Sequence, residues 1–148
     1  MRRADPPSGT GALRLTSDQG NFHVTQGASV ILTGSTAASG GTEAFSVYAA
    51  SKAAVRSFAR DWILDLKGRG IRVNTLSPGP TKTPGFFNLA GPDVARQQGM
   101  LDALAVQIPM GRVGDPDEIA KAAVFLASSD SRFVNGIELF VDGGKAQI

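Results

Sequence analysis

Three short apolar segments alternate with longer segments that have the periodicity of helices. The apolar segments 29–33, 71–76 and 137–141 are rich in β-branched or large apolar side chains, and glycine follows each of them within a few residues. The run 29–33 is apolar at nearly every position, which is typical of a strand buried on both faces of a parallel sheet. The segments 46–67 and 115–128 fit helices that connect such strands. The alternation therefore predicts an α/β fold with a parallel sheet.

Capping residues predict where the helices begin and end. Asp115 suits the N-cap of a helix, Pro116 its first position and Glu118 its third, and together they form a capping box. The long helix ends before Gly68, because glycine is favoured just after a helix. A further helix is expected at 93–107, within a segment that several prolines interrupt.

The long helix over 46–67 has an apolar side, and its basic residues lie elsewhere. We expect Arg56, Arg60 and Lys67 away from the apolar side. The residues expected on the apolar side are Ala50, Ala53, Ala54, Phe58, Ile63 and Leu66.

The composition of the chain excludes several classes of protein. Its 148 residues, 42% of them hydrophobic, are enough for one globular domain and too few for two of full size. The absence of cysteine excludes disulfides, thiolate metal sites and cysteine nucleophiles, and it favours a reducing compartment, so we expect a cytoplasmic protein without a metal centre. No apolar run reaches the roughly 18 to 20 residues that span a bilayer, and no apolar segment of a secretory signal follows the first residues. A net charge of +2 with scattered basic residues predicts neither a nucleic-acid nor a membrane partner.

Residues suited to chemistry lie at the ends of the predicted strands and at the start of the long helix. Ligands of parallel α/β sheets bind beyond the carboxyl ends of the strands, where Ser35 and Pro78–Gly79 stand. Tyr48 and Lys52 are four residues apart and share one helix face. A neighbouring ammonium group favours the phenolate over the phenol, which makes a tyrosine hydroxyl a usable proton donor and acceptor. The alternative is that Tyr48 caps the helix and Lys52 is solvated, and composition does not decide between the two.

Four motifs together resemble the short-chain dehydrogenase/reductase family. They are Thr33–Ser35, the YxxxK segment Tyr48–Lys52, the segment Asn74–Gly79 that ends in a PG turn, and the VDGG segment Val141–Gly144. Their order and spacing are similar to those of the classical branch, which includes 3-oxoacyl-carrier-protein reductases and glucose dehydrogenase-like members. The resemblance covers about residues 27–148.

The resemblance implies a fold, an activity and a set of reacting side chains. The fold would be a truncated Rossmann-like, doubly wound parallel sheet that consists of the last three strands and their helices. The activity would be transfer of a hydride between NAD or NADP and a carbonyl or alcohol substrate. Tyr48 would exchange a proton with the substrate oxygen, Lys52 would support the phenolate and bond to the nicotinamide ribose, and Ser35 would orient the substrate carbonyl. The positions that would bind the cofactor are Tyr48, Lys52, Pro78, Gly79, Thr81 and Thr83.

The family's glycine-rich phosphate-binding turn and the strand before it have no match in the sequence. We therefore expect residues 27–148 to be the C-terminal part of the family's domain and residues 1–26 to be an irregular N-terminal arm. Within that arm, Asn21 followed by Phe22 is a candidate remnant of the helix that carries the family's catalytic asparagine.

Two hypotheses about function remain open. The first is an oxidoreductase of the family type whose dinucleotide-binding half is missing. The second is a catalytically inactive, truncated member that acts through self-association or by pairing with a full-length relative. Because the family's tyrosine-bearing helix packs at subunit contacts, the resemblance implies a homo-oligomer formed through the helix that carries Tyr48. The sequence selects neither the substrate nor NAD over NADP.

Overall fold

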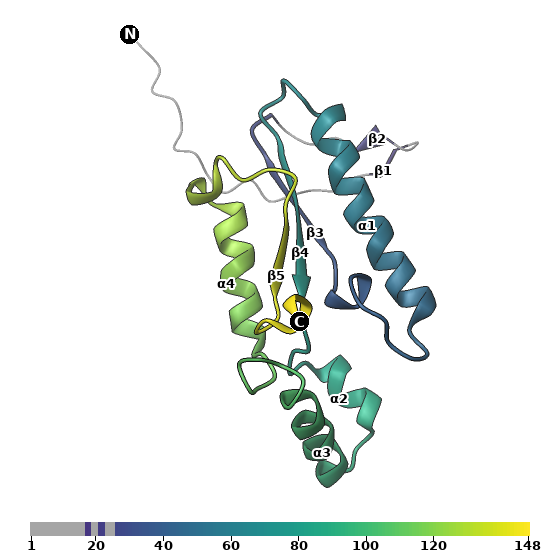
Figure 1. Ribbon diagram of the computed structural model, residues 1–148. Coiled ribbons are helices and arrows are strands. Elements are labelled where there is room, and N and C mark those ends of the chain that lie inside the picture. The colour runs from purple at the N-terminus through teal and green to yellow at the C-terminus, as the bar shows by residue number, and fades with distance from the viewer. Residues whose placement is uncertain (1–16, 19–20, 23–25) are drawn as a thin grey trace.

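The computed structural model describes residues 17–18, 21–22 and 26–148 (Figure 1). Most of the expected arm over residues 1–26 therefore lies outside the described residues. Two short strands in this region, β1 (Ser17–Asp18) and β2 (Asn21–Phe22), pair antiparallel. The expectation that Asn21–Phe22 belongs to a helix remnant is wrong, because both residues lie in a strand.

A three-stranded parallel sheet forms the centre of the molecule. Its strands are β3 (Ser29–Thr33), β4 (Arg72–Pro78) and β5 (Glu138–Val141), in the order β3-β4-β5. The predicted strands and their parallel arrangement are confirmed, with ends that differ by one or two residues. The central strand β4 is buried along most of its length, which agrees with its apolar and small polar side chains.

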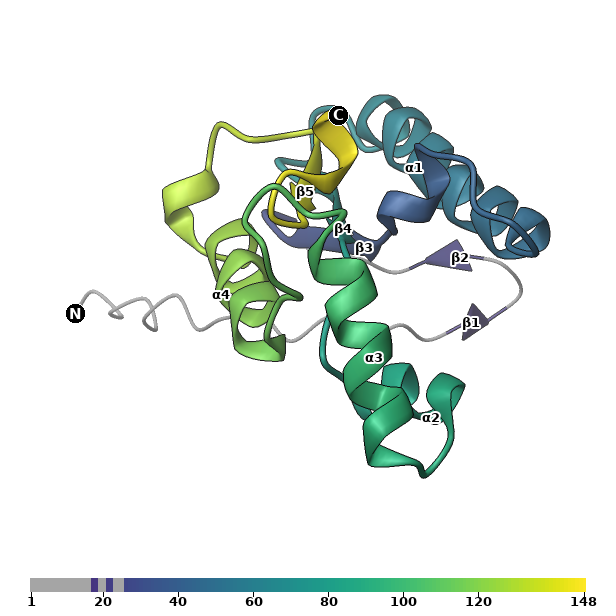
Figure 2. The same cartoon turned by 60° about the horizontal axis from the view of Figure 1, so that its bottom comes forward.

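One helix covers each face of the sheet, as Figures 1 and 2 show. Helix α1 (Ser46–Asp65) packs against β3 and β4, and α4 (Pro116–Ala127) contacts all three strands from the other side. The predicted capping box of α4 is confirmed, with Glu118 Oε2 accepting a hydrogen bond from the Asp115 backbone at 2.9 Å. The alternation of strands and helices thus produces a three-layer arrangement.

The side of α1 that faces the sheet differs from the expected one. Ala59 is fully buried, and its small side chain lets the helix approach the strands closely. Trp62, Ile63 and Leu66 pack with it against the core, so the expectation holds for Ile63 and Leu66. Phe58, by contrast, is 50% exposed. The alanines at positions 50, 53 and 54 are also exposed.

Two further helices form a lobe beyond the carboxyl ends of the strands (Figure 1). Helix α3 (Val94–Ala105) confirms the expected helix near 93–107, whereas α2 (Pro84–Ala90) was not predicted. Thr83 caps α2 by accepting a hydrogen bond from the backbone N–H of Phe86. Three short 3₁₀ helices complete the described secondary structure: η1 (Thr36–Ala38), η2 (Ser129–Ser131) and η3 (Lys145–Gln147). Over the part of the chain that the structure describes, no helix is both long and apolar enough to cross a bilayer.

Candidate functional site

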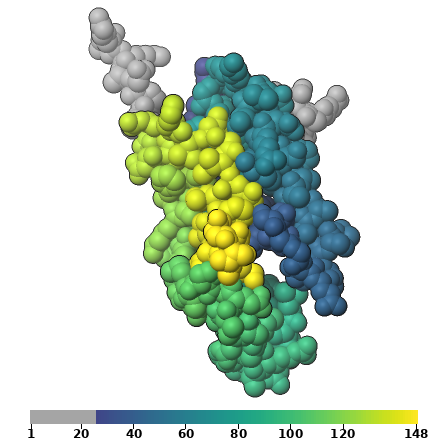
Figure 3. Space-filling model, viewed as in Figure 1, coloured from purple at the N-terminus to yellow at the C-terminus, as the bar shows by residue number. Residues whose placement is uncertain are grey.

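The carboxyl ends of the three central strands meet at one edge of the sheet. The register pairs Thr33 with Leu76 and Pro78 with Val141, so the loops after the three strands begin at similar heights. Figure 1 shows this edge facing the lobe formed by α2 and α3. Figure 3 shows the surface hollowed between that lobe and the segment that contains η1. This is the edge where ligands of parallel α/β sheets bind.

Ser35 lies two residues beyond the end of β3 and caps η1. Its backbone is extended, and its Oγ accepts a hydrogen bond from the Ala37 backbone N–H at 3.2 Å. Because a hydroxyl that accepts one bond keeps its own O–H, Ser35 can still donate to a ligand.

Tyr48 and Lys52 lie on the first turns of α1, above the end of β3. The Lys52 Nζ donates a hydrogen bond to the Thr33 carbonyl oxygen at 3.0 Å and lies 5.8 Å from the centroid of the Tyr48 ring. Tyr48 is 45% exposed, and its ring packs edge-on against Phe45. Phe45 occupies the N-cap of α1, so Tyr48 does not cap the helix. The structure thus brings Tyr48 and Lys52 to the strand that leads into Ser35.

The strand ends approach each other closely, and two glycines make this possible. The Gly34 N–H bonds to the Leu76 carbonyl at 2.8 Å, and a Cβ at Gly34 would overlap the Ser77 hydroxyl. A Cβ at Gly79 would lie 2.6 Å from the Cβ of Asp142. Any larger residue at either position would push the strands apart.

The segment after β4 forms a sharp turn and then leads into α2. The Thr81 hydroxyl donates to the Gly79 carbonyl at 2.9 Å, and Thr81 forms an isolated parallel bridge with Gly114. The Thr81 side chain therefore closes the turn. The Thr83 hydroxyl accepts the helix-capping bond from Phe86 and keeps its own O–H for a ligand.

These side chains form a donor set that fits a nicotinamide cofactor. The Lys52 ammonium has three N–H groups, and one of them is directed at the Thr33 carbonyl. The other N–H groups and the Tyr48 hydroxyl suit ribose hydroxyls. The Thr83 hydroxyl suits an amide or a phosphate.

A cavity of about 300 Å³ lies next to this edge but is a separate feature. It is bordered by Pro80, by the end of β5 and by the start of α4, and neither Ser35, Tyr48 nor Lys52 lines it. At its rim Arg112 and Glu118 form two hydrogen bonds, of 2.8 and 2.6 Å. The Arg112 guanidinium and then the Asp115 backbone lower the pKa of Glu118 to about 2. The three candidate side chains therefore lie outside this cavity.

Sequence reasoning missed two features near the site. The Thr33 carbonyl is the acceptor for Lys52, and no sequence signal marks a backbone acceptor. Glu138 on β5 is ion-paired with Arg56 of α1, although Arg56 was expected on the polar side of the helix. A glutamate inside an otherwise apolar strand was the available signal, because a buried carboxylate needs a partner.

The chain is similar to many known proteins. A family model described as enoyl-(acyl carrier protein) reductase matches residues 7–146. This match starts before residue 27, where the resemblance was expected to begin, and the division of the chain at that residue stays a prediction. An oxidoreductase of Sarocladium schorii is 45% identical over 138 residues, which are 93% of this chain and 51% of that protein.

Two further comparisons agree with these. An NADP-dependent (R)-specific alcohol dehydrogenase of Lentilactobacillus kefiri is 40% identical over 120 residues, which are 80% of this chain and 45% of that protein. The solved structure of a Thermoplasma acidophilum aldohexose dehydrogenase superposes with a TM-score of 0.77 at 33% identity, covering 81% of this chain and 48% of that one. The chain spans about half the length of these relatives. With the motifs, the parallel sheet and the family model in agreement, the chain belongs to the short-chain dehydrogenase/reductase family of NAD(P)-dependent oxidoreductases.

Proposed function

We propose that the protein takes part in an NAD(P)-dependent interconversion of a carbonyl and an alcohol, with Ser35, Tyr48 and Lys52 as the reacting side chains. The observation that carries this proposal is the position of Lys52. Its Nζ is fixed on the Thr33 carbonyl at 3.0 Å and lies beside the Tyr48 ring, at the end of the strand that leads to Ser35. A lysine that was simply solvated would not need this contact with a backbone carbonyl.

Each of the three side chains has a chemical task in this reaction. When bound, the nicotinamide ring supplies or accepts the hydride at the substrate carbon. Tyr48 donates its hydroxyl proton to the substrate oxygen during reduction and takes a proton back during oxidation. The Lys52 ammonium stabilises the negative charge that stays on the tyrosine oxygen. Ser35 donates a hydrogen bond to the substrate carbonyl oxygen and so fixes its direction.

The cofactor would be held by residues at two strand ends. Lys52 and Tyr48 would bond to the ribose of the nicotinamide half. The Pro78–Gly79 turn would contact the nicotinamide, Thr81 would contribute its backbone, and Thr83 would contribute its hydroxyl. The choice between NAD and NADP depends on groups beyond this set.

We also propose that copies of the chain associate through α1. Val47 is 84% exposed and Phe58 50% exposed, and the exposed Ala54 lies between them on the same outer stripe of the helix. An exposed apolar stripe of this kind favours a protein contact. The same contact would serve the inactive, truncated member that the sequence left open, so association alone does not identify an enzyme.

Deuterium transfer tests the proposed activity. The purified protein is incubated with NADH or NADPH that carries deuterium at the transferable position, together with a panel of ketones, aldehydes and sugar derivatives. We expect consumption of the reduced cofactor and one deuterium on the carbinol carbon of the product, detected by mass spectrometry. The Lys52→Ala variant is the control and should lose the signal. If neither cofactor is consumed with any substrate, the inactive alternative replaces this proposal.

A further inference from the structure

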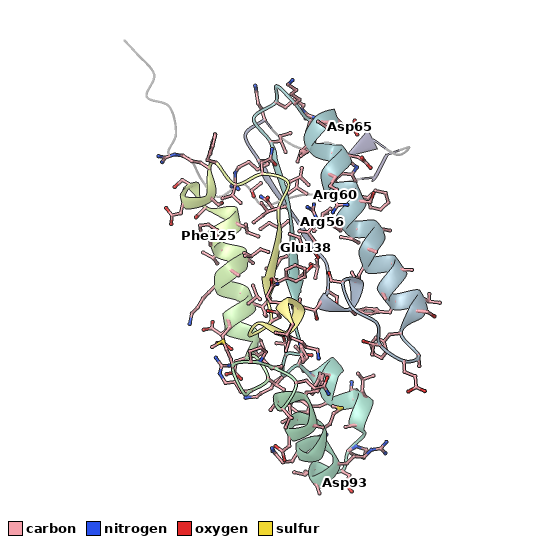
Figure 4. All side chains as sticks on the ribbon, in the orientation of Figure 1. Arg56, Arg60, Asp65, Asp93, Phe125 and Glu138 are labelled. Atoms are coloured by element: carbon pink, nitrogen blue, oxygen red, sulfur yellow. The ribbon has the colours of Figure 1, made fainter. Side chains whose placement is uncertain are left out.

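A buried ion pair connects α1 to the last strand of the sheet. The Arg56 Nε lies 3.5 Å from Glu138 Oε2, and the two side chains are only 18% and 15% exposed. The other carboxylate oxygen, Oε1, accepts a hydrogen bond from the Ser77 hydroxyl at 2.6 Å. Figure 4 shows Arg56 reaching from α1 toward the sheet, next to Glu138 on β5. One carboxylate therefore contacts side chains from two other elements.

This arrangement is costly for stability alone. Charges removed from water lose hydration, and a packed apolar pair of similar volume is often at least as stable as a buried ion pair. Two nearby polar atoms, Arg56 Nη1 and Thr75 Oγ1, are buried without a hydrogen-bond partner. Thr75 pairs with Glu138 in the sheet register and is itself fully buried. The buried Glu138 carboxylate is therefore better explained by a task that requires a fixed geometry.

The ion pair involves the same helix as two of the proposed reacting groups. Arg56 follows Lys52 by four residues and Tyr48 by eight, so the three side chains follow one side of α1. Ser77, on the central strand, immediately precedes Pro78–Gly79. The contacts of Glu138 thus connect the helix that carries Tyr48 with the strand that leads into the Pro78–Gly79 turn.

The same carboxylate also influences the end of β3. The Ser77 side chain fills the space above Gly34, where a Cβ would overlap its hydroxyl. Gly34 separates Thr33, whose carbonyl receives Lys52, from Ser35. The hydrogen bond to Glu138 holds the Ser77 hydroxyl in place. The Ser77 side chain is therefore a fixed packing surface for the end of β3, next to the proposed reacting groups.

We propose that Glu138 is a positioning residue for the carbonyl–alcohol reaction. Through Arg56 and Ser77, its carboxylate sets the position of α1 relative to the ends of β3 and β4, and hence the distance of Tyr48 and Lys52 from Ser35. The proposal rests on the proposed function, because it concerns the geometry of that reaction. A misplacement of about 1 Å by a distant mutation can cost about 10²-fold in rate.

Two variants of Glu138 and one control test this role in the active protein. Glu138→Ala removes both contacts and should lower kcat about 10- to 100-fold, with KM and the cofactor dissociation constant nearly unchanged. Glu138→Gln keeps an acceptor for Ser77 and should recover part of the lost kcat. Thr75→Val is the control: this neighbour on the same face is altered almost isosterically, and kcat should stay at the wild-type value. All assays are run well below the melting temperature of each variant.

The outcomes separate the two proposals. A wild-type protein that is inactive with every substrate overturns the proposed function, and the positioning role with it. An active wild type with an unchanged kcat in Glu138→Ala overturns the positioning role and leaves the proposed function standing. A kcat loss in Thr75→Val as large as that in Glu138→Ala also overturns it, because any disturbance of this face would then suffice. If Glu138→Ala does not fold, Glu138→Gln and Ser77→Ala decide by the same kcat criterion.

Discussion

Gly34 has less room than almost any other residue at the site. Its Cα lies against Ser77 and Thr75, and an added Cβ would overlap the Ser77 hydroxyl and lie 2.8 Å from Thr75 Cγ2. Its backbone does not adopt a positive φ, so the constraint is steric and not conformational. Both neighbours are fully buried and have little freedom to move away.

We therefore expect Gly34→Ala to lower the free energy of unfolding by about 1 to 3 kcal/mol, as overpacking of a buried site does. Gly40→Ala is the matched control, since a Cβ at Gly40 meets nothing within 4 Å. Urea unfolding of both variants measures the effect. Equal unfolding midpoints for the two variants would show that β3 and β4 are not packed as tightly as described.

The Glu118 carboxylate makes the free energy of unfolding depend on pH in the acidic range. Its pKa falls from 4.5 to about 2, chiefly through the hydrogen bond from Arg112 and then through that from the Asp115 backbone. Because the folded-state pKa is depressed, the stabilising effect is present above the unfolded-state pKa and is lost as the pH falls through the folded-state pKa. The loss therefore lies between about pH 4.5 and pH 2.

Glu118→Gln tests this effect, since glutamine keeps an acceptor for the cap but has no charge. We expect the wild type to melt at a higher temperature than the variant above about pH 5, and the difference to shrink as the pH falls toward 2. Thermal unfolding of both proteins over this range gives the answer. A difference that does not change with pH would contradict the ion-pair origin of the shift.

At the scale of elements, local signals predicted the strands and the start of α4. The apolar runs and the Asp115–Glu118 capping box act over a few residues, so their outcome did not depend on the rest of the chain. The face of α1 could not be predicted in this way, because apolar residues occur on more than one side of the helix. The buried position of Arg56 depends on Glu138, which follows it by about 80 residues in the sequence.

The candidate site likewise has features that local sequence patterns predict and features that they do not. The one-face arrangement of Tyr48 and Lys52 follows from helical spacing, and the placement of Ser35 follows from the end of its strand. The Thr33 carbonyl that receives Lys52 is a backbone atom and leaves no trace in the side-chain pattern. Helix α2 has local start signals, with Thr83 at the N-cap and Pro84 in the first turn, but at seven residues it is too short to show a periodic apolar pattern.

The exposed apolar stripe of α1, formed by Val47, Ala54 and Phe58, leads to a prediction about self-association. Ala54→Arg places a charge between Val47 and Phe58, so copies that associate through this stripe should separate, and the measured mass in light scattering should fall to that of a smaller species. Ala103→Arg, the same change at an exposed position of α3, is the control and should leave the mass unchanged. An unchanged mass for Ala54→Arg would place any self-association on another surface.

At the scale of the whole molecule, the parallel sheet places the segments that follow its strands at one edge. The three strands bring together Ser35, the Pro78–Gly79 turn and the segment after β5. Helix α1 places Tyr48 and Lys52 near the same edge. The molecule spans about half the length of its relatives and retains their fold over that span. In the proposed function, Tyr48 transfers the proton in a carbonyl–alcohol interconversion.

The turnover of Tyr48→Phe tests this claim most directly. The substitution removes only the hydroxyl and keeps the ring that packs against Phe45. We expect kcat for carbonyl reduction to fall by about 10² to 10⁴-fold, with the cofactor dissociation constant and the melting temperature close to those of the wild type. A Tyr48→Phe protein that reduces the same substrate at the wild-type rate would contradict the account.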